Sequence, residues 1–303
     1  MQKSKKKRMS KTRIAFILFC CAIPVIEWLI FYIYGNASSF MMAFTNGQGE
    51  LSFDNFVRLW EELHSPISDI ALAVKNTVLS FVILMVMFPF QVLVAYFIYK
   101  KVPGYSIHRM LFFLPTILFS VATSMIIMRM FSVNGFIAEG VQALFGLEEV
   151  PELLADSRYA NTTVLAHMVW MRIPGDLIIW GGTFARIPED VLESGKIDGV
   201  TWWQEFTRII VPIVWPTVGL KMVLQVCQIF NASGAVFLLT EGEFGTMTLS
   251  CWMYKELLNG ATTGISTAYN YMSAVGLVMT VIAVTLSIVI RRWVDKAFEE
   301  VEY

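Results

Sequence analysis

Polar side chains inside long apolar runs are the residues best placed to do chemistry in this chain. Arg172 and Asp176 lie four positions apart, so on a helix they share one face and can form an ion pair. Gln225 and Gln228 share a face in the same way at a spacing of three, and Asn231 continues that face with some drift. Charged and amide side chains are costly inside a membrane, and where they occur they often line the path of a polar solute.

Each set also has a purely structural interpretation. The Arg172–Asp176 pair could be a buried ion pair or could bridge to a neighbouring helix, and the three amides could join helices by hydrogen bonds. Pro174 lies between the two charged residues and is expected to kink or loosen their helix. Lys221 lies near the inner end of the run that holds the glutamines, and we expect its amine to reach back to the membrane interface.

Catalytic motifs are absent from the sequence. Gly195-Lys196 is followed by Ile197, so the phosphate-binding G-x-x-x-x-G-K-[S/T] loop does not occur, and this chain is not expected to hydrolyse ATP. The three histidines are far apart, and neither His-Glu-x-x-His nor Cys-x-x-Cys occurs, which predicts no metal site and no catalytic residue. The four cysteines are expected to be free, buried thiols. A net charge of −1 gives no reason to expect a nucleic-acid partner.

Composition predicts an all-α, polytopic membrane protein. Of the 303 residues, 56% are hydrophobic and 16% are charged, whereas soluble domains have about 25% charged residues. Each long apolar run is near the roughly 20 residues that a helix needs to cross a bilayer. We therefore expect six transmembrane helices, at residues 14–34, 76–99, 109–131, 163–184, 213–239 and 271–290.

Lysine and arginine predict the orientation of these helices. The segments 1–13, 100–109, 184–211 and 291–303 hold 16 of the 23 basic residues, so the positive-inside rule places both termini in the cytoplasm. A cleaved signal peptide is the alternative for the first run, but the run is too long and no Ala-x-Ala site follows it. The expected organisation is a basic cytoplasmic N-terminus at 1–13, one transmembrane domain at 14–290 and a cytoplasmic C-terminus at 291–303.

The segment 184–212 is a polar interruption on the positively charged side, and its residues predict a helix–turn–helix. Asp198-Gly199 is a helix stop, because glycine accepts the left-handed conformation that ends many helices. Thr201 with Gln204 three residues later forms a capping box that starts a second, short helix.

This second helix is expected to carry an apolar face that has nothing in its own loop to bury against, formed by Trp202, Trp203 and Phe206. Such a face on a polar loop is suited to docking into a groove on a soluble partner.

In this loop the sequence resembles the permease subunits of ATP-binding-cassette importers. Their signature is Glu-Ala-Ala, three residues and Gly, and the stretch from Glu193 to Gly199 keeps the Glu and the Gly and replaces both alanines with small residues. The resemblance implies a type I importer permease fold, with this loop seated in a cleft of the ATPase subunit. It assigns the coupling role to Glu193, Asp198, Gly199, Trp202, Trp203 and Phe206.

Other segments resemble the carbohydrate-uptake branch of that family, namely Lys75-Asn76-Thr77, Phe112-Phe113-Leu114-Pro115 and Ser273-Ala274-Val275-Gly276. This resemblance implies a sugar or oligosaccharide as substrate, with its pocket partly on the fifth span. The implied partners are a second permease subunit, two ATPase subunits that hold ATP and Mg, an extracytoplasmic sugar-binding protein and membrane lipid. No cofactor is expected on this chain itself.

Three other functions are open on the sequence. An importer of the same superfamily for a polyamine, phosphate-like or peptide substrate would share the loop but not the stretch at 273–276. A membrane scaffold or secondary transporter would need no ATPase, but secondary transporters show repeated halves with broken helices, and the sequence indicates none. A membrane-embedded enzyme would need a convergent catalytic cluster, which the sequence lacks.

Overall fold

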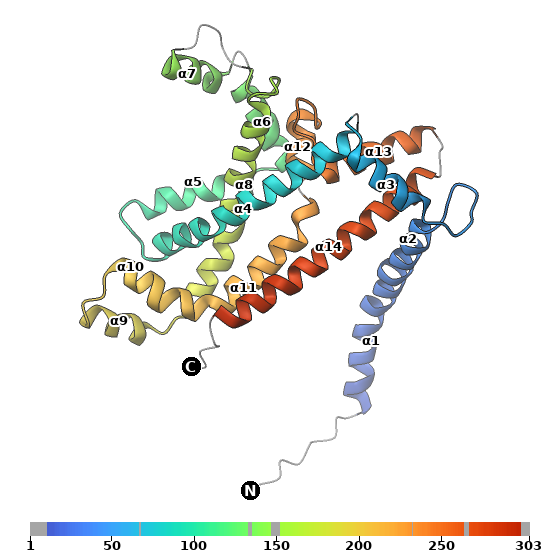
Figure 1. Cartoon of the computed structure of the whole chain (residues 1–303). Helices are drawn as coiled ribbons and strands as arrows, with labels where there is room; N and C mark the ends of the chain where they lie inside the picture. The colour runs from blue at the N-terminus through green and yellow to red at the C-terminus, as the bar shows by residue number, and fades with distance from the viewer. Residues whose placement is uncertain are drawn as a thin grey trace. The chain divides into compact units, whose positions relative to one another are not determined.

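The computed structural model is all-helical, as the composition predicts, apart from one isolated bridge between Thr45 and Leu51 in the described part (Figure 1). The residues that the structure describes are 11–66, 68–132, 135–146, 152–231, 233–263 and 267–297. They form two compact units. The first comprises Met1–Trp60 and Asn259–Val278, and the second comprises Glu61–Leu258 and Met279–Tyr303.

The described residues contain five helical segments that are long and apolar enough to cross a membrane, so the chain is a multi-pass membrane protein. The five are Phe19–Ala43, Asp69–Tyr99, Val121–Phe145 (which runs over residues 133 and 134, outside the described part), Trp202–Cys227 and Ala268–Ala297. The predicted span at 163–184 is not among them. Its helix, α8 (Ala160–Phe184), is 25 residues long and unbroken despite Pro174, but it carries Arg172 and Asp176 in its middle.

The first unit begins with α1 (Lys11–Glu27), η1 (Trp28–Tyr34) and α2 (Gly35–Ala43), which follow one another as one helical run. The apolar window in this run is 0% buried within the chain, so its side chains are available to lipid or to a partner. The run continues to Ala43, past the predicted end at residue 34, because no helix stop intervenes.

Aromatic packing and side-chain hydrogen bonds hold the turn after α2. The rings of Phe44 and Phe53 meet edge to face with centroids 5.5 Å apart. Asn55, on α3 (Asp54–His64), donates to the Thr45 carbonyl at 3.0 Å. Asn270, near the start of α14 (Thr267–Ala297), donates to the same carbonyl at 3.0 Å. The two amide side chains thus add to the backbone pairing across this turn, where the Ser52 N–H donates to the Phe44 carbonyl at 2.8 Å.

The core of the second unit lies between α4 (Asp69–Tyr99) and α8, where the rings of Phe88 and Trp180 meet with centroids 5.8 Å apart. Asn76 on α4 donates to the carbonyls of Gly245 and Met247 at 2.8 and 2.9 Å, and so ties this helix to a distant turn. The other elements of the unit are α5 (Tyr105–Ile117), α6 (Ser120–Phe131), α7 (Phe136–Phe145), α9 (Glu189–Ile197), α10 (Trp202–Gln204), η2 (Glu205–Ile210), α11 (Val211–Cys227), η3 (Ile229–Asn231), α12 (Ser233–Thr240), and parts of α13 (Leu249–Thr263) and α14.

Two predicted spans are not single helices. The span expected at 109–131 is broken, because Leu118 and Phe119 are extended, with ψ of 145° and 135°, between α5 and α6. The span expected at 213–239 is also broken, because α11 ends at Cys227, a short 3-10 turn follows, and α12 begins at Ser233. The expectation of an uninterrupted fifth span was therefore wrong, and the break falls among its polar residues.

Candidate functional site

Buried charges from α8 and α11 meet in the second unit. The Lys221 amine donates to Asp176 Oδ1, and the two side chains are only 10% and 8% exposed. The expectation that Lys221 reaches the membrane interface is therefore wrong, because a buried carboxylate binds its amine instead. Each charge neutralises the other, and removal of the carboxylate would leave the amine as an unpaired charge in the interior.

Arg172 lies beside this pair and gives the site an excess of positive charge. Its Nη1 donates to Gln228 Oε1 at 2.7 Å, and its Nε lies 3.9 Å from Asp176 Oδ2. The predicted pairing of Arg172 with Asp176 is present, but it is the longer of the two ion pairs made by this carboxylate. One carboxylate against two cations leaves a net charge of +1.

The amides of the fifth predicted span lie at the end of α11, which stops at Cys227. Gln228 caps the helix with φ −95° and ψ 0°, whereas Gln225 lies inside the last turn and is buried. The backbone of Asn231 ends η3, and its side chain lies outside the described part of the chain. The Gln228 N–H still donates to the Leu224 and Gln225 carbonyls at 3.2 Å, so the break in the span comes between Gln228 and Asn231.

Arg172, Asp176, Lys221, Gln225 and Gln228 together form what we call the polar cluster. Three of its buried atoms, Arg172 Nε, Asp176 Oδ2 and Gln225 Nε2, have no hydrogen-bond partner among the described residues. A buried polar atom without a partner costs about 1–3 kcal/mol. The cluster thus offers hydrogen-bond donors and an acceptor to a polar solute. It lies beside the break that follows α11. Inside a membrane, such a break is tolerated where the backbone is buried in protein or lines a cavity.

The predicted helix stop at Asp198-Gly199 is confirmed. Gly199 has φ +71°, its N–H donates to the Lys196 carbonyl at 3.1 Å, and the Val200 N–H donates to the Gly195 carbonyl at 3.0 Å. These two bonds satisfy carbonyls at the end of α9 and define a Schellman cap. Asp198 is the C-cap residue of α9 and its backbone has helical φ and ψ. The Glu193 side chain is exposed on the same helix.

The predicted capping box is also confirmed, but the helix that it starts is not short. The Thr201 N–H donates to Gln204 Oε1 at 3.0 Å, and the Gln204 N–H donates to Thr201 Oγ1 at 3.4 Å. Instead of ending as a short helix, α10 continues through the π-helical η2 into α11. One helical run therefore extends from Trp202 to Cys227, that is, from the polar loop to the edge of the polar cluster.

The three aromatic residues expected to form a docking face separate into two groups. Trp202 and Trp203 are 53% and 52% exposed, so they are available to a partner. Phe206 is only 8% exposed, and its ring packs on Tyr96 with centroids 5.2 Å apart. The expectation that Phe206 has nothing to bury against is wrong, because α4 of the same chain covers it.

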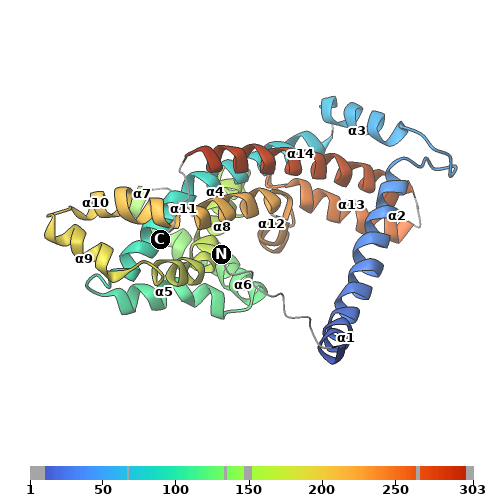
Figure 2. The same ribbon diagram turned by 90° about the horizontal axis from the view of Figure 1, so that it is seen from below.

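An ion pair that the sequence did not reveal joins the end of α4 to η2. Lys100 Nζ donates to both carboxylate oxygens of Glu205, at 2.7 and 2.9 Å, and Glu205 is buried. Figure 2 shows α9, α10 and α5 at the same end of the second unit. Close packing also fixes α9 on η2, because a Cβ at Gly195 would lie 3.0 Å from Ile209 Cδ1. We call α9, α10 and η2 (189–210) the coupling hairpin.

Cysteine and metal chemistry have little support in the described residues. All four cysteines are free, and only Cys251 is buried, so the expectation of buried thiols fails for Cys20, Cys21 and Cys227. Burial raises the pKa of the Cys251 thiol above its ordinary value, which makes it a poor nucleophile. Within the same residues, no group of three or more metal-binding side chains occurs.

The arrangement of these helices is the fold of an importer permease. A crystal structure of a bacterial ABC transporter involved in the import of the acidic polysaccharide alginate contains a chain that superposes with a TM-score of 0.79. The match is 22% identical and covers 94% of this chain and 97% of that one. A second structure of a bacterial alginate ABC transporter, in complex with a pentasaccharide-bound periplasmic protein, superposes equally well, with a TM-score of 0.79.

Sequence comparison confirms the resemblance to permeases of sugar importers. The chain is 26% identical over 280 residues to the lactose transport system permease protein LacF of Rhizobium radiobacter, covering 90% of this chain and 88% of LacF. It is 27% identical over 195 residues to the maltose/maltodextrin permease protein MalF of Vibrio vulnificus, covering 64% of this chain and 37% of MalF. The chain therefore spans well under half the length of MalF. No protein-family profile matches the chain.

Proposed function

We propose that this chain is one permease subunit of a bacterial ATP-binding-cassette importer that moves a sugar or oligosaccharide across the cytoplasmic membrane. The observation that carries the proposal is the helical run from Trp202 to Cys227. Its first turn belongs to the coupling hairpin and exposes two tryptophans, and its last turn holds Gln225 of the polar cluster. At about 1.5 Å per residue, its 26 residues extend for nearly 40 Å, enough to cross the membrane.

In this proposal the coupling hairpin is the contact with an ATPase subunit. Trp202 and Trp203 supply exposed apolar surface for docking, and Glu193, Asp198 and Gly199 shape the helix and turn beside them. The Lys100–Glu205 ion pair and the Phe206–Tyr96 contact fasten the same segment to α4. A push on the hairpin would therefore move α4 and α11 together. ATP and Mg would be bound by the ATPase subunits, and this chain would contribute no catalytic residue.

Because this chain would bind neither ATP nor Mg, the importer would need other subunits. Two ATPase subunits, a second permease subunit and an extracytoplasmic sugar-binding protein would complete the importer. The basic segments at 1–13, 100–109, 184–211 and 291–303 support a cytoplasmic location for both termini and for the coupling hairpin. The five apolar segments with α8 would give six spans, and α8 would tolerate its charges because the polar cluster pairs them.

The positive charge of the polar cluster supports an acidic sugar over a neutral one. Lys221 neutralises Asp176, whose carboxylate lies 3.9 Å from Arg172. The one hydrogen-bond partner that remains for Arg172 among the described residues is the neutral amide of Gln228. A guanidinium group in this position suits a sugar carboxylate, which it can bind through paired N–H donors. Substitution of Arg172 with Gln should then reduce uptake of an acidic oligosaccharide more than uptake of its neutral analogue. Equal losses for the two sugars would contradict the preference.

The function itself is tested by co-purification and by transport. The full chain, tagged and extracted from its native membrane, should bring with it an ATPase and a second permease, and the mixture should hydrolyse ATP. Vesicles that hold the complex should then take up sugar only when ATP and a sugar-binding protein are supplied. Purification of the chain without an ATPase, or uptake driven by an ion gradient alone, would refute the proposal in favour of a secondary transporter.

A further inference from the structure

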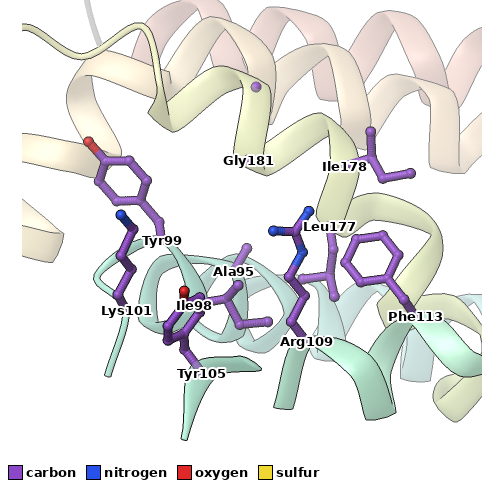
Figure 3. A pocket seen from close by; sticks show the side chains of 11 residues that line it. Ala95, Ile98, Tyr99, Lys101, Tyr105, Arg109, Phe113, Leu177, Ile178 and Gly181 are labelled. Carbon is purple, nitrogen blue, oxygen red and sulfur yellow. The ribbon is translucent and has the colours of Figure 1, made fainter. Parts of the chain in front are cut away.

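A cavity of about 600 Å³ opens between α4, α5 and α8, and no residue of the polar cluster lines it (Figure 3). It lies beside the turn that joins α4 to α5, a turn held by an H-bond from the Lys100 N–H to the Tyr96 carbonyl at 2.9 Å. Gly181 and Gly182 form its wall on α8, and a Cβ at either position would have no neighbouring atom within 4 Å. The two glycines therefore keep this wall flat and the cavity open.

The cavity has a cationic part and an apolar part. Lys101 and Arg109 supply two positive charges, and Figure 3 shows the Arg109 side chain reaching from α5 toward α8. The Arg109 guanidinium carbon lies 5.7 Å from the centre of the Phe113 ring, so the cation rests on an aromatic wall. The remaining lining is mostly apolar, with Leu177 and Ile178 contributed by α8.

Both cations lack an acidic partner in the described part of the chain. The adjacent Lys100 binds Glu205, but no carboxylate in that part of the chain forms an ion pair with Lys101 or Arg109. The cavity therefore presents two cations that make no ion pair among the described residues, beside mostly apolar side chains. A ligand that matches it must combine an anionic group with a hydrocarbon segment.

The position of the cavity identifies the source of such a ligand. The apolar span of α4 ends at Tyr99, a lining residue, so the cavity lies at the level where lipid headgroups meet the hydrocarbon. Outside it, α5 exposes an apolar strip that leads from the cavity into the bilayer, with Ile107 66%, Met110 71% and Leu111 60% exposed. A lipid could place its phosphate against the cations and its chain along this strip.

We propose that this cavity binds an anionic phospholipid of the membrane, with its phosphate group between Lys101 and Arg109 and its acyl chain against Phe113 and Ile178. Basic pockets between helices at a membrane surface have the chemistry that recognises anionic headgroups. This site is independent of sugar and of ATP. It rests on the membrane location of the chain and not on the proposed transport function.

The test measures lipid retention by native mass spectrometry of the full chain with its co-purified subunits. The protein is delipidated in detergent and titrated with phosphatidylglycerol or with phosphatidylcholine of the same acyl chains. Each cation near a membrane surface contributes about a fivefold change in affinity for anionic lipid. Lys101→Gln and Arg109→Gln should thus each weaken phosphatidylglycerol binding about fivefold, and the double variant about 25-fold, with phosphatidylcholine binding unchanged. Arg292→Gln is the matched control, since Arg292 is an exposed cation outside the cavity.

A filling variant tests the shape of the site independently of its charge. Gly181→Leu should occupy the cavity and displace phosphatidylglycerol, whereas Gly175→Leu, at an equally open glycine of the same helix, should not. Equal binding of the two lipids by the native protein would overturn the proposal, as would unchanged binding in the Lys101→Gln variant, whose exposed turn position should not impair folding. Competition by inorganic phosphate at the same concentration as lipid would show a free-anion site and would also overturn it. Loss of lipid binding upon assembly with the co-purified permease would assign the cavity to a protein interface instead.

Discussion

The buried ion pair between Asp176 and Lys221 allows a quantitative test of the polar cluster. Both side chains are about nine-tenths buried, so removal of the Asp176 charge leaves Lys221 without a counter-charge in the interior, whereas removal of Lys221 leaves Asp176 with Arg172 at 3.9 Å. Measurements on other proteins place the cost of breaking such a pair at about 3–5 kcal/mol, whereas replacing both partners with apolar side chains of similar size is often neutral. Asp176→Asn should therefore destabilise the protein more than Lys221→Met, and the double variant Asp176→Leu with Lys221→Met should recover the part of the loss that comes from the unpaired Lys221.

Thermal unfolding in detergent, followed by tryptophan fluorescence, measures these differences. One kcal/mol shifts Tm by about 2 °C at this chain length, so the Asp176→Asn variant should lose about 6–10 °C and the Lys221→Met variant less. Raising the salt concentration should leave these losses in place, because solvent ions screen buried charges poorly.

The control is the exposed pair of Arg291 and Asp295, which has the 3.9 Å separation typical of a weak contact and side chains 78% and 67% exposed. Asp295→Asn should cost less than about 1 kcal/mol. A loss under 2 °C in the Asp176→Asn variant, or a double variant as unstable as the sum of the singles, would refute the reasoning. Either result would mean that the two charges contribute to stability independently of each other.

The other predictions concern the coupling hairpin. Gly199→Val should reduce ATP-driven uptake more than Gly199→Asn, because asparagine tolerates a φ of +71° and valine does not; equal uptake by the two variants would show that the turn conformation is unimportant. Substitution of Trp202 and Trp203 with alanine should weaken co-purification of the ATPase with little change in Tm. Phe206→Ala should instead lower Tm, by an amount corresponding to about 3–5 kcal/mol, since that ring is buried in the core. Lys100→Met should leave ATPase binding intact but reduce the uptake per ATP hydrolysed, and an unchanged ratio would exclude a mechanical role for its ion pair.

Local signals in the sequence predicted the coupling hairpin well. The helix stop at Gly199 and the capping box at Thr201 depend on residues within five positions of one another, and their hydrogen bonds are those that the residue types require. The apolar runs likewise predicted the all-helical, membrane-spanning class, because bilayer crossing is determined by length and hydropathy.

Contacts between distant segments were not predictable in the same way. Lys221 was misassigned because its carboxylate partner lies 45 positions away on another helix, and the Lys100–Glu205 pair joins residues 105 positions apart. The broken fifth span was missed because hydropathy is averaged over a window and does not register a short turn. Phe206 was misplaced because an apolar face on a loop gives no information about whether another part of the chain covers it.

The π-helical segment Glu205–Ile210 determines the rotation of the coupling hairpin about the helix axis relative to α11. A π-turn accommodates one residue more than an α-turn, so it acts as a one-residue insertion that resets the phase of every side chain beyond it. Deletion of one residue from this segment would restore α-helical bonding and turn Trp202 and Trp203 by about 100° relative to Gln225. The tryptophans would then face a different direction while the span kept its own packing. The rotational phase between the two ends of this helix is therefore set by a single residue.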